Sequence, residues 1–262
     1  MNRYRRVRGR VKSDSVHRYL KNKVSYNEKI HLTLIDPDKV TSFEELERIA
    51  DELFSAGTDA FLVGGSVGVS ERDVDEVVKA LKKFNLPVIL FPGNISGLSR
   101  EADALLFMSL LNSDDPYFIV GAAVLGAPIV LRYELEALPT AYIIVGYGGA
   151  AGYVGRARPI PYEKPELGAA YVLAAKYLGM KYVYLEAGSG APEPIPQEFI
   201  FTSSKVKGDA VLIVGGGIRT PDQALNAVKA GADAIVTGTV IEKNPKQATE
   251  IVKAVKKYSR KH

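Results

Sequence analysis

Short apolar runs alternate along the chain with longer segments in which apolar residues recur every three or four positions. The short runs are rich in β-branched and aliphatic residues, which favour strands. They cover residues 30–35, 59–63, 87–91, 104–110, 141–145, 182–186, 210–214 and 234–237. The longer segments predict amphipathic helices; the first, residues 43–56, places Phe43, Leu46, Ala50 and Leu53 on one face. Strands that are apolar throughout, rather than at alternate positions, are typical of a parallel sheet buried on both faces.

Eight such strand–helix units predict one (β/α)8 TIM barrel, and an open doubly wound sheet is the alternative fold with the same alternation. An internal repeat favours the barrel, because residues 56–65 resemble residues 230–239. We expect the third helix to be missing or reduced to a turn, since residues 92–102 are few and include two glycines. An extra amphipathic piece is expected near residues 130–138, and residues 146–164 predict an unusually long loop.

The composition limits the kinds of site that the chain can build. The 262 residues include no Cys, which excludes disulfides and thiolate metal sites, and three His leave little room for a His-rich zinc site. No apolar run is long enough to span a bilayer, and the N-terminus lacks the apolar core of a signal peptide. We therefore expect a cytoplasmic protein.

The basic residues are concentrated at the start of the chain. Residues 3–23 hold nine Lys and Arg against one acid, Asp14, in a chain of net charge +4. This pattern predicts a basic N-terminal arm, residues 1–25, before a barrel domain, residues 26–262. The simpler interpretation is an arm that is only solvated. The more specific interpretation is that the arm is attracted to an anionic ligand or to a membrane surface. No nucleic-acid partner is expected, because no basic stripe with interleaved aromatic residues follows.

In a barrel of this kind the loops after the strands gather at one end, and the site lies there. Gly215, Gly216 and Gly217 follow the seventh predicted strand, and Gly238 and Thr239 follow the eighth. This is the placement of a barrel phosphate cradle, in which bare backbone N–H groups bind the anion. The alternative is that these glycines only permit tight turns.

Two carboxylates end strands at the same edge. Asp36 follows the first strand; it can cap the next turn or, with Ser66 from the neighbouring loop, hold Mg²⁺ through oxygen ligands. Glu186 ends the sixth strand, where it can act as a base, bind substrate hydroxyls or serve the barrel's own hydrogen bonds. Arg219 is expected to pair with a nearby acid, and His31 to be a structural histidine.

Taken together, the loop motifs resemble those of the geranylgeranylglyceryl phosphate synthase family, prenyltransferases that form the first ether bond of archaeal membrane lipids. The resemblance runs in order from His31 to the last helix. It rests on HLTLIDPD (31–38), GGS (64–66), FPG (91–93), LLNS (110–113), YLEAGSG (184–190), VGGGIR (214–219) and TGT (237–239). Leu34 stands where some members carry a lysine, so the chain is similar to the second branch of the family, group II.

The resemblance implies a barrel whose third helix is replaced by an extended segment, Mg²⁺ at Asp36 and Ser66, and sn-glycerol 1-phosphate and a prenyl diphosphate as substrates. It also implies an assembly of more than one copy. The implied glycerol phosphate site consists of Tyr184, Leu185, Glu186, Ala187, Gly188, Ser189, Gly190, Gly216, Gly217, Gly238 and Thr239.

For such a reaction Glu186 and Asp36 are the expected catalytic residues. Glu186 orients the attacking hydroxyl and takes its proton, while Asp36 holds the Mg²⁺ that neutralises the leaving diphosphate. Two other functions compete with this one: a sugar-phosphate isomerase or epimerase, and a barrel that binds a phosphorylated ligand without catalysis. An isomerase or epimerase needs an acid–base pair across its substrate; the position of its second acid is hard to find here, and the strand-end loops lack histidine.

Overall fold

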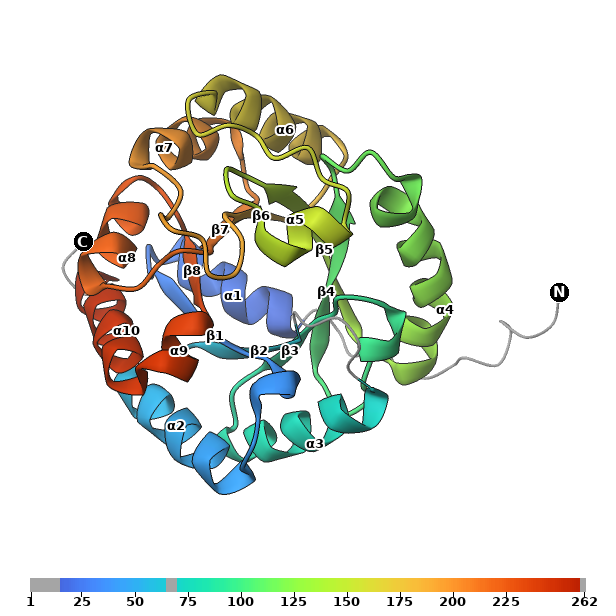
Figure 1. Cartoon of the computed structure of the whole chain (residues 1–262), viewed down its shortest axis with the longest axis vertical. Helices are drawn as coiled ribbons and strands as arrows, with labels where there is room; N and C mark the ends of the chain where they lie inside the picture. Colours follow the sequence, from blue (N-terminus) through green and yellow to red (C-terminus); the bar gives the residue numbers. More distant parts are fainter. Residues whose placement is uncertain (1–14, 65–69, 260–262) are drawn as a thin grey trace, which may run out of the picture.

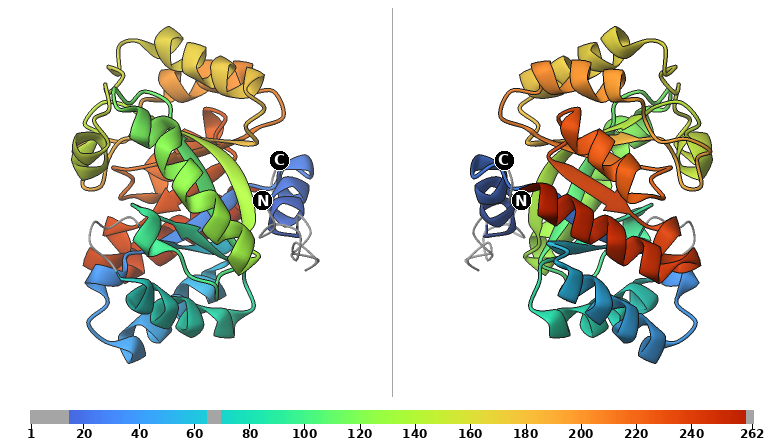
Figure 2. Two further views of the ribbon diagram at one scale, coloured as in Figure 1. Left: turned by 90° about the vertical axis from the view of Figure 1, so that its right-hand side faces the viewer. Right: turned by 90° about the vertical axis from the view of Figure 1, so that its left-hand side faces the viewer.

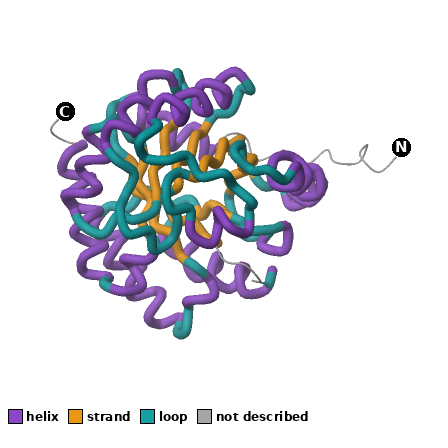
Figure 3. The backbone as a smooth tube through the Cα atoms, turned by 45° about the horizontal axis from the view of Figure 1, so that its top comes forward, coloured by secondary structure: helices purple, strands orange, loops and turns teal. Residues whose placement is uncertain are grey.

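The computed structural model describes residues 15–64 and 70–259, and within them the chain forms a closed parallel barrel, β1 to β8 in sequence order. The predicted (β/α)8 barrel is confirmed. Each strand pairs in parallel with the next, and β1 closes the barrel against β8. Figure 1 shows the helices as an outer ring around the strands, and Figure 3 shows loops gathered over one end of the barrel.

All eight predicted strands are present. Their bounds are β1 Ile30–Ile35, β2 Ala60–Gly64, β3 Val88–Phe91, β4 Ala104–Leu110, β5 Glu136–Ile144, β6 Tyr182–Glu186, β7 Val211–Gly215 and β8 Ala234–Thr237. The helices are α1 Ser15–Ser25, α2 Phe43–Ala56, α3 Glu71–Leu81, α4 Ala122–Tyr133, α5 Gly149–Val154, α6 Pro165–Tyr177, α7 Gln197–Val206, α8 Pro221–Lys229, α9 Thr239–Lys243 and α10 Pro245–Ser259. Short helical turns complete the set: η2 Pro37–Lys39, η3 Lys82–Phe84, η4 Ile95–Gly97 and the π-helical η5 Tyr117–Gly121.

The third helix of the outer ring is reduced to η4, as the sequence predicts. Asn94 begins this turn by accepting a hydrogen bond from the N–H of Ser96 at 2.9 Å; Leu98 is extended, and a second turn at residues 100–101 leads to β4. The β3 unit therefore has no regular helix of its own, and α4, the helix that follows β4, lies at the neighbouring position (Figure 1).

The expectation of an extra amphipathic piece near residues 130–138 is wrong. Residues up to Tyr133 complete α4, and β5 already begins at Glu136. Pro139 hides this strand in the sequence, because proline argues against a central strand. Here Phe107 faces Pro139 in the register of β4 and β5, and pairing on both sides continues past it.

The part of the basic arm that the structure describes is a helix packed on the barrel, not a solvated segment. Helix α1 buries Val16 and Leu20 against the N-terminal ends of the strands. Glu136 caps its first turn, accepting from the N–H groups of Val16 at 2.9 Å and His17 at 2.7 Å. Figure 2 shows α1 at the opposite end of the barrel from α5. Apolar positions at helical spacing decide the outcome here, while Arg18 stays exposed and Lys23 pairs with an acid of the barrel.

The repeat seen in the sequence has a structural purpose at the same end. Asp59, just before β2, accepts from the N–H of His31 at 2.8 Å, and Asp233, just before β8, accepts from the N–H of Leu212 at 2.8 Å. Each carboxylate also pairs with lysine: Lys256 at 2.9 Å from Asp59, and Lys207 at 2.9 Å from Asp233. The repeated acid thus ties each of these strands to the one beside it.

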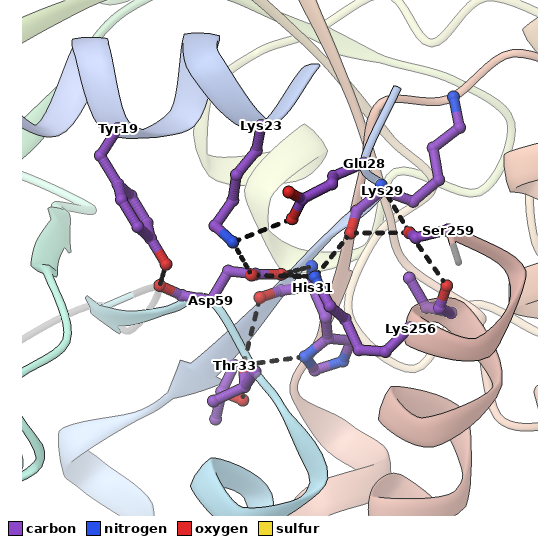
Figure 4. A network of polar contacts seen from close by, with 11 residues as sticks. Tyr19, Lys23, Glu28, Lys29, His31, Thr33, Asp59, Lys256 and Ser259 are labelled. Atoms are coloured by element: carbon purple, nitrogen blue, oxygen red, sulfur yellow. Dashed lines mark hydrogen bonds and ion pairs between the residues drawn. The ribbon is translucent and has the colours of Figure 1, made fainter. Parts of the chain in front are cut away.

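Asp59 is the centre of a polar network that joins several elements (Figure 4). Besides Lys256 it pairs with Lys23 of α1 at 3.0 Å, so one buried carboxylate joins α1, β1 and α10. His31 beside it contacts the hydroxyls of Thr58 and Thr237 at 3.0 Å each. Burial lowers the pKa of His31 to about 3, which keeps the ring neutral. The structure therefore assigns His31 to the barrel's stability.

Replacing Asp59 by Ala should lower the free energy of unfolding by about 3–5 kcal/mol, because two lysines and one N–H group lose their buried acceptor. Asp51→Ala, an exposed carboxylate on α2, is the matched control and should change it by less than about 0.5 kcal/mol. Denaturant unfolding followed by circular dichroism measures both. Equal effects of the two substitutions would contradict the role given to Asp59.

Candidate active site

A cavity of about 270 Å³ opens at the carboxyl ends of the strands. Its polar end is formed by residues that follow β1, β6, β7 and β8, namely Asp36, Glu186, Ser189, Arg219, Thr239 and Glu242. Its other end is apolar and extends between η4 and α4, where Leu105, Phe107, Phe118, Ala122, Gly126 and Val130 line it. One continuous space therefore joins a site for a charged group to a site for an apolar chain.

The glycine turns after β7 and β8 lie side by side at the polar end. Gly216 and Gly217 have φ of +83° and +71°, a left-handed backbone that favours glycine. A Cβ on Gly216 would lie 2.5 Å from Glu186 Oε1 and 2.7 Å from Gly188 N, so the backbone approaches the β6 loop as closely as it can. After β8, Gly238 leads into the short helix α9, which the sequence did not predict.

The loop after β6 closes the third side of this glycine pocket. Ser189 Oγ lies 3.2 Å from Thr239 Oγ1 and so connects the loop to the start of α9. Of the residues expected to bind glycerol phosphate, eight line the cavity: Tyr184, Glu186, Ser189, Gly190, Gly216, Gly217, Gly238 and Thr239. Leu185 and Ala187 do not: both pack in the apolar layer between strands and helices. Gly188 contributes its N–H group to Glu186 rather than a surface of the cavity.

Glu186 is buried and is held by hydrogen-bond donors. The N–H of Gly188 donates to Oε1 at 2.6 Å, and the hydroxyls of Tyr184 and Tyr142 donate to the same carboxylate. Burial raises the pKa of Glu186 above its usual value, and the three donors oppose that rise. Burial, together with the charge of Glu186, raises the pKa of both tyrosines well above 10, so they remain donors.

The two tyrosines also form an aromatic cluster with Phe91. The Phe91 and Tyr184 rings stack at 5.5 Å, and the Tyr142 ring packs edge-on to both at 5.7 and 5.3 Å. All three residues line the cavity at the junction between its polar and apolar ends. Tyr142 was not among the predicted site residues, although its register position opposite Tyr184 would place it inside the barrel once the strands were aligned.

Asp36 lies at the rim of the same cavity, and Ser66, its predicted partner for Mg²⁺, lies outside the described residues. Asp36 begins η2 by accepting a hydrogen bond from the N–H of Asp38 at 3.1 Å, which confirms that it caps this turn. Glu242 on α9, which sequence reasoning missed, lines the cavity too; burial and then the charge of Asp36 raise its pKa.

Within the described ranges no three His, Cys, Asp or Glu residues cluster as a metal site. That arrangement suits Mg²⁺, which is commonly held by one or two protein groups and the phosphates of its substrate. Asp36, a carboxylate at the rim of a cavity that the glycine turns also line, fits such a role.

Arg219 pairs with no acid among the described residues, contrary to the prediction. Its guanidinium donates to the backbone carbonyls of Pro192 at 2.9 Å and Gly190 at 3.3 Å, and also to that of Ala191. Backbone carbonyls in a loop have no partners in the barrel's sheet. The planar guanidinium of arginine carries five N–H donors and can donate to several such carbonyls at once.

The apolar end follows from the missing helix. Three small residues of α4, Ala122, Ala123 and Gly126, line the cavity, whereas Gly121 does not. From the other side come Ala150, Ala151 and Val154 of α5, a helix formed inside the long loop after β5. Among the described helices, none combines the length and the apolar character that a bilayer crossing requires.

Comparison with known proteins places this geometry among prenyl transfer enzymes. The sequence profile of the PcrB family matches residues 22–257. Geranylgeranylglyceryl phosphate synthase of Saccharolobus solfataricus is 53% identical over 96% of each chain, and that of Sulfolobus acidocaldarius is 49% identical over 94% of this chain and 95% of its own.

One solved structure shows the same architecture with a ligand. The (S)-3-O-geranylgeranylglyceryl phosphate synthase of Thermoplasma acidophilum, in complex with its substrate sn-glycerol-1-phosphate, has a TM-score of 0.85 and 40% identity, over 91% of this chain and 97% of its own.

The close approach at Gly216 gives a test of the glycine pocket. Gly216→Ala should lower the thermal unfolding midpoint markedly, because its Cβ would meet Glu186 Oε1 and the Gly188 amide. Gly190→Ala is the matched control: Gly190 has a similar φ of +73°, but a Cβ there meets nothing within 4 Å. Differential scanning calorimetry compares them. If the two variants unfold at the same temperature, backbone strain alone explains Gly216 and the close packing is unimportant.

Proposed function

This chain belongs to the PcrB family, and we propose that it is a geranylgeranylglyceryl phosphate synthase, which joins geranylgeranyl diphosphate to sn-glycerol 1-phosphate in the first ether-forming step of archaeal membrane lipid synthesis. The observation that supports this proposal most strongly is one continuous cavity with a glycine-lined polar end, a buried carboxylate in the middle and an apolar end. An isomerase or epimerase needs no apolar channel of this kind.

The polar end fits the phosphate of glycerol 1-phosphate. The backbone N–H groups of Gly216, Gly217 and Thr239 lie at the turns after β7 and β8, where helix starts and left-handed glycines favour an anion. With the phosphate there, the glycerol extends along β6 towards Tyr184 and Glu186.

The apolar end fits the prenyl chain. Burial of a C20 tail is worth up to roughly 16 kcal/mol before the costs of binding, at about 0.8 kcal/mol per carbon. The walls of α4 and α5 supply the apolar surface, and they also exclude water, which would compete for the allylic carbon.

The proposed reaction takes place where the two ends meet. The C3 hydroxyl oxygen of glycerol phosphate forms a bond to the first carbon of the prenyl chain, while the bond from that carbon to the diphosphate breaks and the diphosphate leaves with the electron pair. Glu186 accepts the hydroxyl proton. Its anionic form is preserved by the Gly188, Tyr142 and Tyr184 donors despite burial.

Asp36 is the proposed ligand of Mg²⁺, with Ser66 as the second. The ion, when bound with the substrate, supplies positive charge to the leaving diphosphate. Asp36 stands at the rim of the cavity on the side of β1, across the barrel opening from β6, and so separates the leaving group from the base.

The proposal includes assembly into homo-oligomers and contact with a membrane surface. Exposed apolar side chains support both: Tyr117, Val120, Val124 and Leu125 border the apolar end of the cavity, and Tyr177, Leu178 and Phe201 lie exposed on α6, its C-terminal cap and α7.

The function is tested by mixing the protein with sn-glycerol 1-phosphate, labelled geranylgeranyl diphosphate and Mg²⁺, and following label into the ether-linked phosphate. Glu186→Gln should lower kcat by about 100-fold or more and leave glycerol phosphate binding within a few-fold. Glu193→Gln, an exposed glutamate of the same loop, is the control and should turn over normally. The base role is wrong if Glu186→Gln keeps its kcat, and the function is wrong if the wild type forms no ether.

The metal assignment has its own readout. Mn²⁺ bound in the presence of inorganic diphosphate, followed by electron paramagnetic resonance, should bind Asp36→Asn at least about tenfold more weakly than the wild type, because a charged oxygen ligand is lost. Asp38→Asn, two residues away and exposed, should bind as the wild type does. Unchanged Mn²⁺ affinity in Asp36→Asn would exclude Asp36 as the ligand.

A further inference from the structure

The cavity contains more negative than positive charge, although both proposed substrates are anions. Asp36, Glu186 and Glu242 line it, and among the described residues Arg219 is the only basic side chain that does so. A phosphate monoester carries a charge of about −2 at pH 7, so backbone dipoles alone would have to offset it beside these acids.

Arg219 stands at the phosphate end of the cavity. It lies two residues after Gly217 on the same turn, and its guanidinium donates to the carbonyls of residues 190–192. The segment that it holds is continuous with Ser189, which in turn contacts Thr239 at the start of α9. Arg219 therefore braces two of the three walls of the glycine pocket.

The charge of Arg219 is not neutralised by the described protein. Within the described part of the chain its guanidinium donates to neutral carbonyl oxygens, and no carboxylate accepts from it. The side chain is exposed at the rim, where solvent screens it in the free protein and an entering phosphate would displace that solvent. Leu34, on β1, presents only an apolar side chain to Gly238 and adds no cation from that side.

We propose that Arg219 is a substrate-binding residue. Its guanidinium supplies the positive charge for the phosphate monoester held at Gly216–Gly217 and Gly238–Thr239. Its hydrogen bonds to backbone carbonyls fix the loop beside that phosphate. The inference rests on the proposed function for the identity of the ligand, but its chemistry requires only a phosphate monoester. It separates two roles of one side chain, charge and bracing, which respond differently to substitution.

The experiment measures the Kd of sn-glycerol 1-phosphate by calorimetry for the wild type, Arg219→Gln, Arg219→Lys and Arg158→Gln. Arg219→Gln should weaken binding by about tenfold or more, since the charge is lost, whereas Arg219→Lys keeps the charge and should stay within about threefold. Arg158→Gln is the matched control: this arginine is exposed, pairs with Asp114 at 3.1 Å and does not line the cavity. It should bind as the wild type does.

Two outcomes overturn the inference. Unchanged affinity in Arg219→Gln removes Arg219 from the binding site, and an Arg219→Lys variant as weak as Arg219→Gln reduces its role to bracing the loop. If Arg219→Gln does not fold, Arg219→Lys decides alone, because a loss of more than about tenfold there contradicts the charge role. A wild type that binds glycerol phosphate but forms no ether would contradict the proposed function and leave the Arg219 comparison valid.

Discussion

The site depends on keeping one carboxylate charged inside a barrel. Glu186 is 6% exposed, at the end of β6, and burial by itself would favour its protonated form. Hydrogen bonds from the N–H of Gly188 and from the hydroxyls of Tyr142 and Tyr184 stabilise the anion there. This requirement explains the surroundings of Glu186: a left-handed glycine two residues later, and a tyrosine on the neighbouring strand at the level of Tyr184. The close approach of Gly216 to Oε1 leaves no room for a side chain that would displace these donors.

The two ends of the barrel use polar groups for opposite purposes. At the N-terminal end, Asp59, Asp233 and Glu136 accept hydrogen bonds from backbone N–H groups, and the two aspartates also pair with lysines. These contacts tie α1 and the strands together. At the other end Asp36, Glu186 and Arg219 line open space. A buried carboxylate that is satisfied by the protein stabilises the fold, whereas one that faces a cavity keeps capacity for a ligand. The fold can therefore lose the third helix beside η4, and gain an apolar channel, without losing the network that closes the barrel.

Much of this could be predicted from the sequence, because the determining features are local. The apolar runs predict the strands, and the glycine turns at Gly216 and Gly238 lie, as expected, at one end of the barrel with Glu186 beside them. What could not be predicted depends on pairing between distant segments. The start of β5 was hidden by Pro139, whose neighbours decide its strand conformation. Helix α1 was hidden by its charges, since only the barrel end makes Val16 and Leu20 core residues. Tyr142, Glu242 and the carbonyl partners of Arg219 come from other strands or loops, and no spacing along the chain brings them to the site.

The central claim is that Glu186 works as an anion held by donated hydrogen bonds, and the pH–rate profile of Tyr142→Phe tests it most directly. The ionised carboxylate is the active form, so kcat falls as the pH drops through the pKa of Glu186. Removing the Tyr142 hydroxyl takes away a donor that lowers this pKa, while the ring that packs on Phe91 and Tyr184 remains. The acid limb should therefore move to higher pH. Tyr133→Phe, which loses a hydrogen bond to Glu71 away from the cavity, should leave the limb in place. An acid limb that is identical in Tyr142→Phe and the wild type would contradict the account.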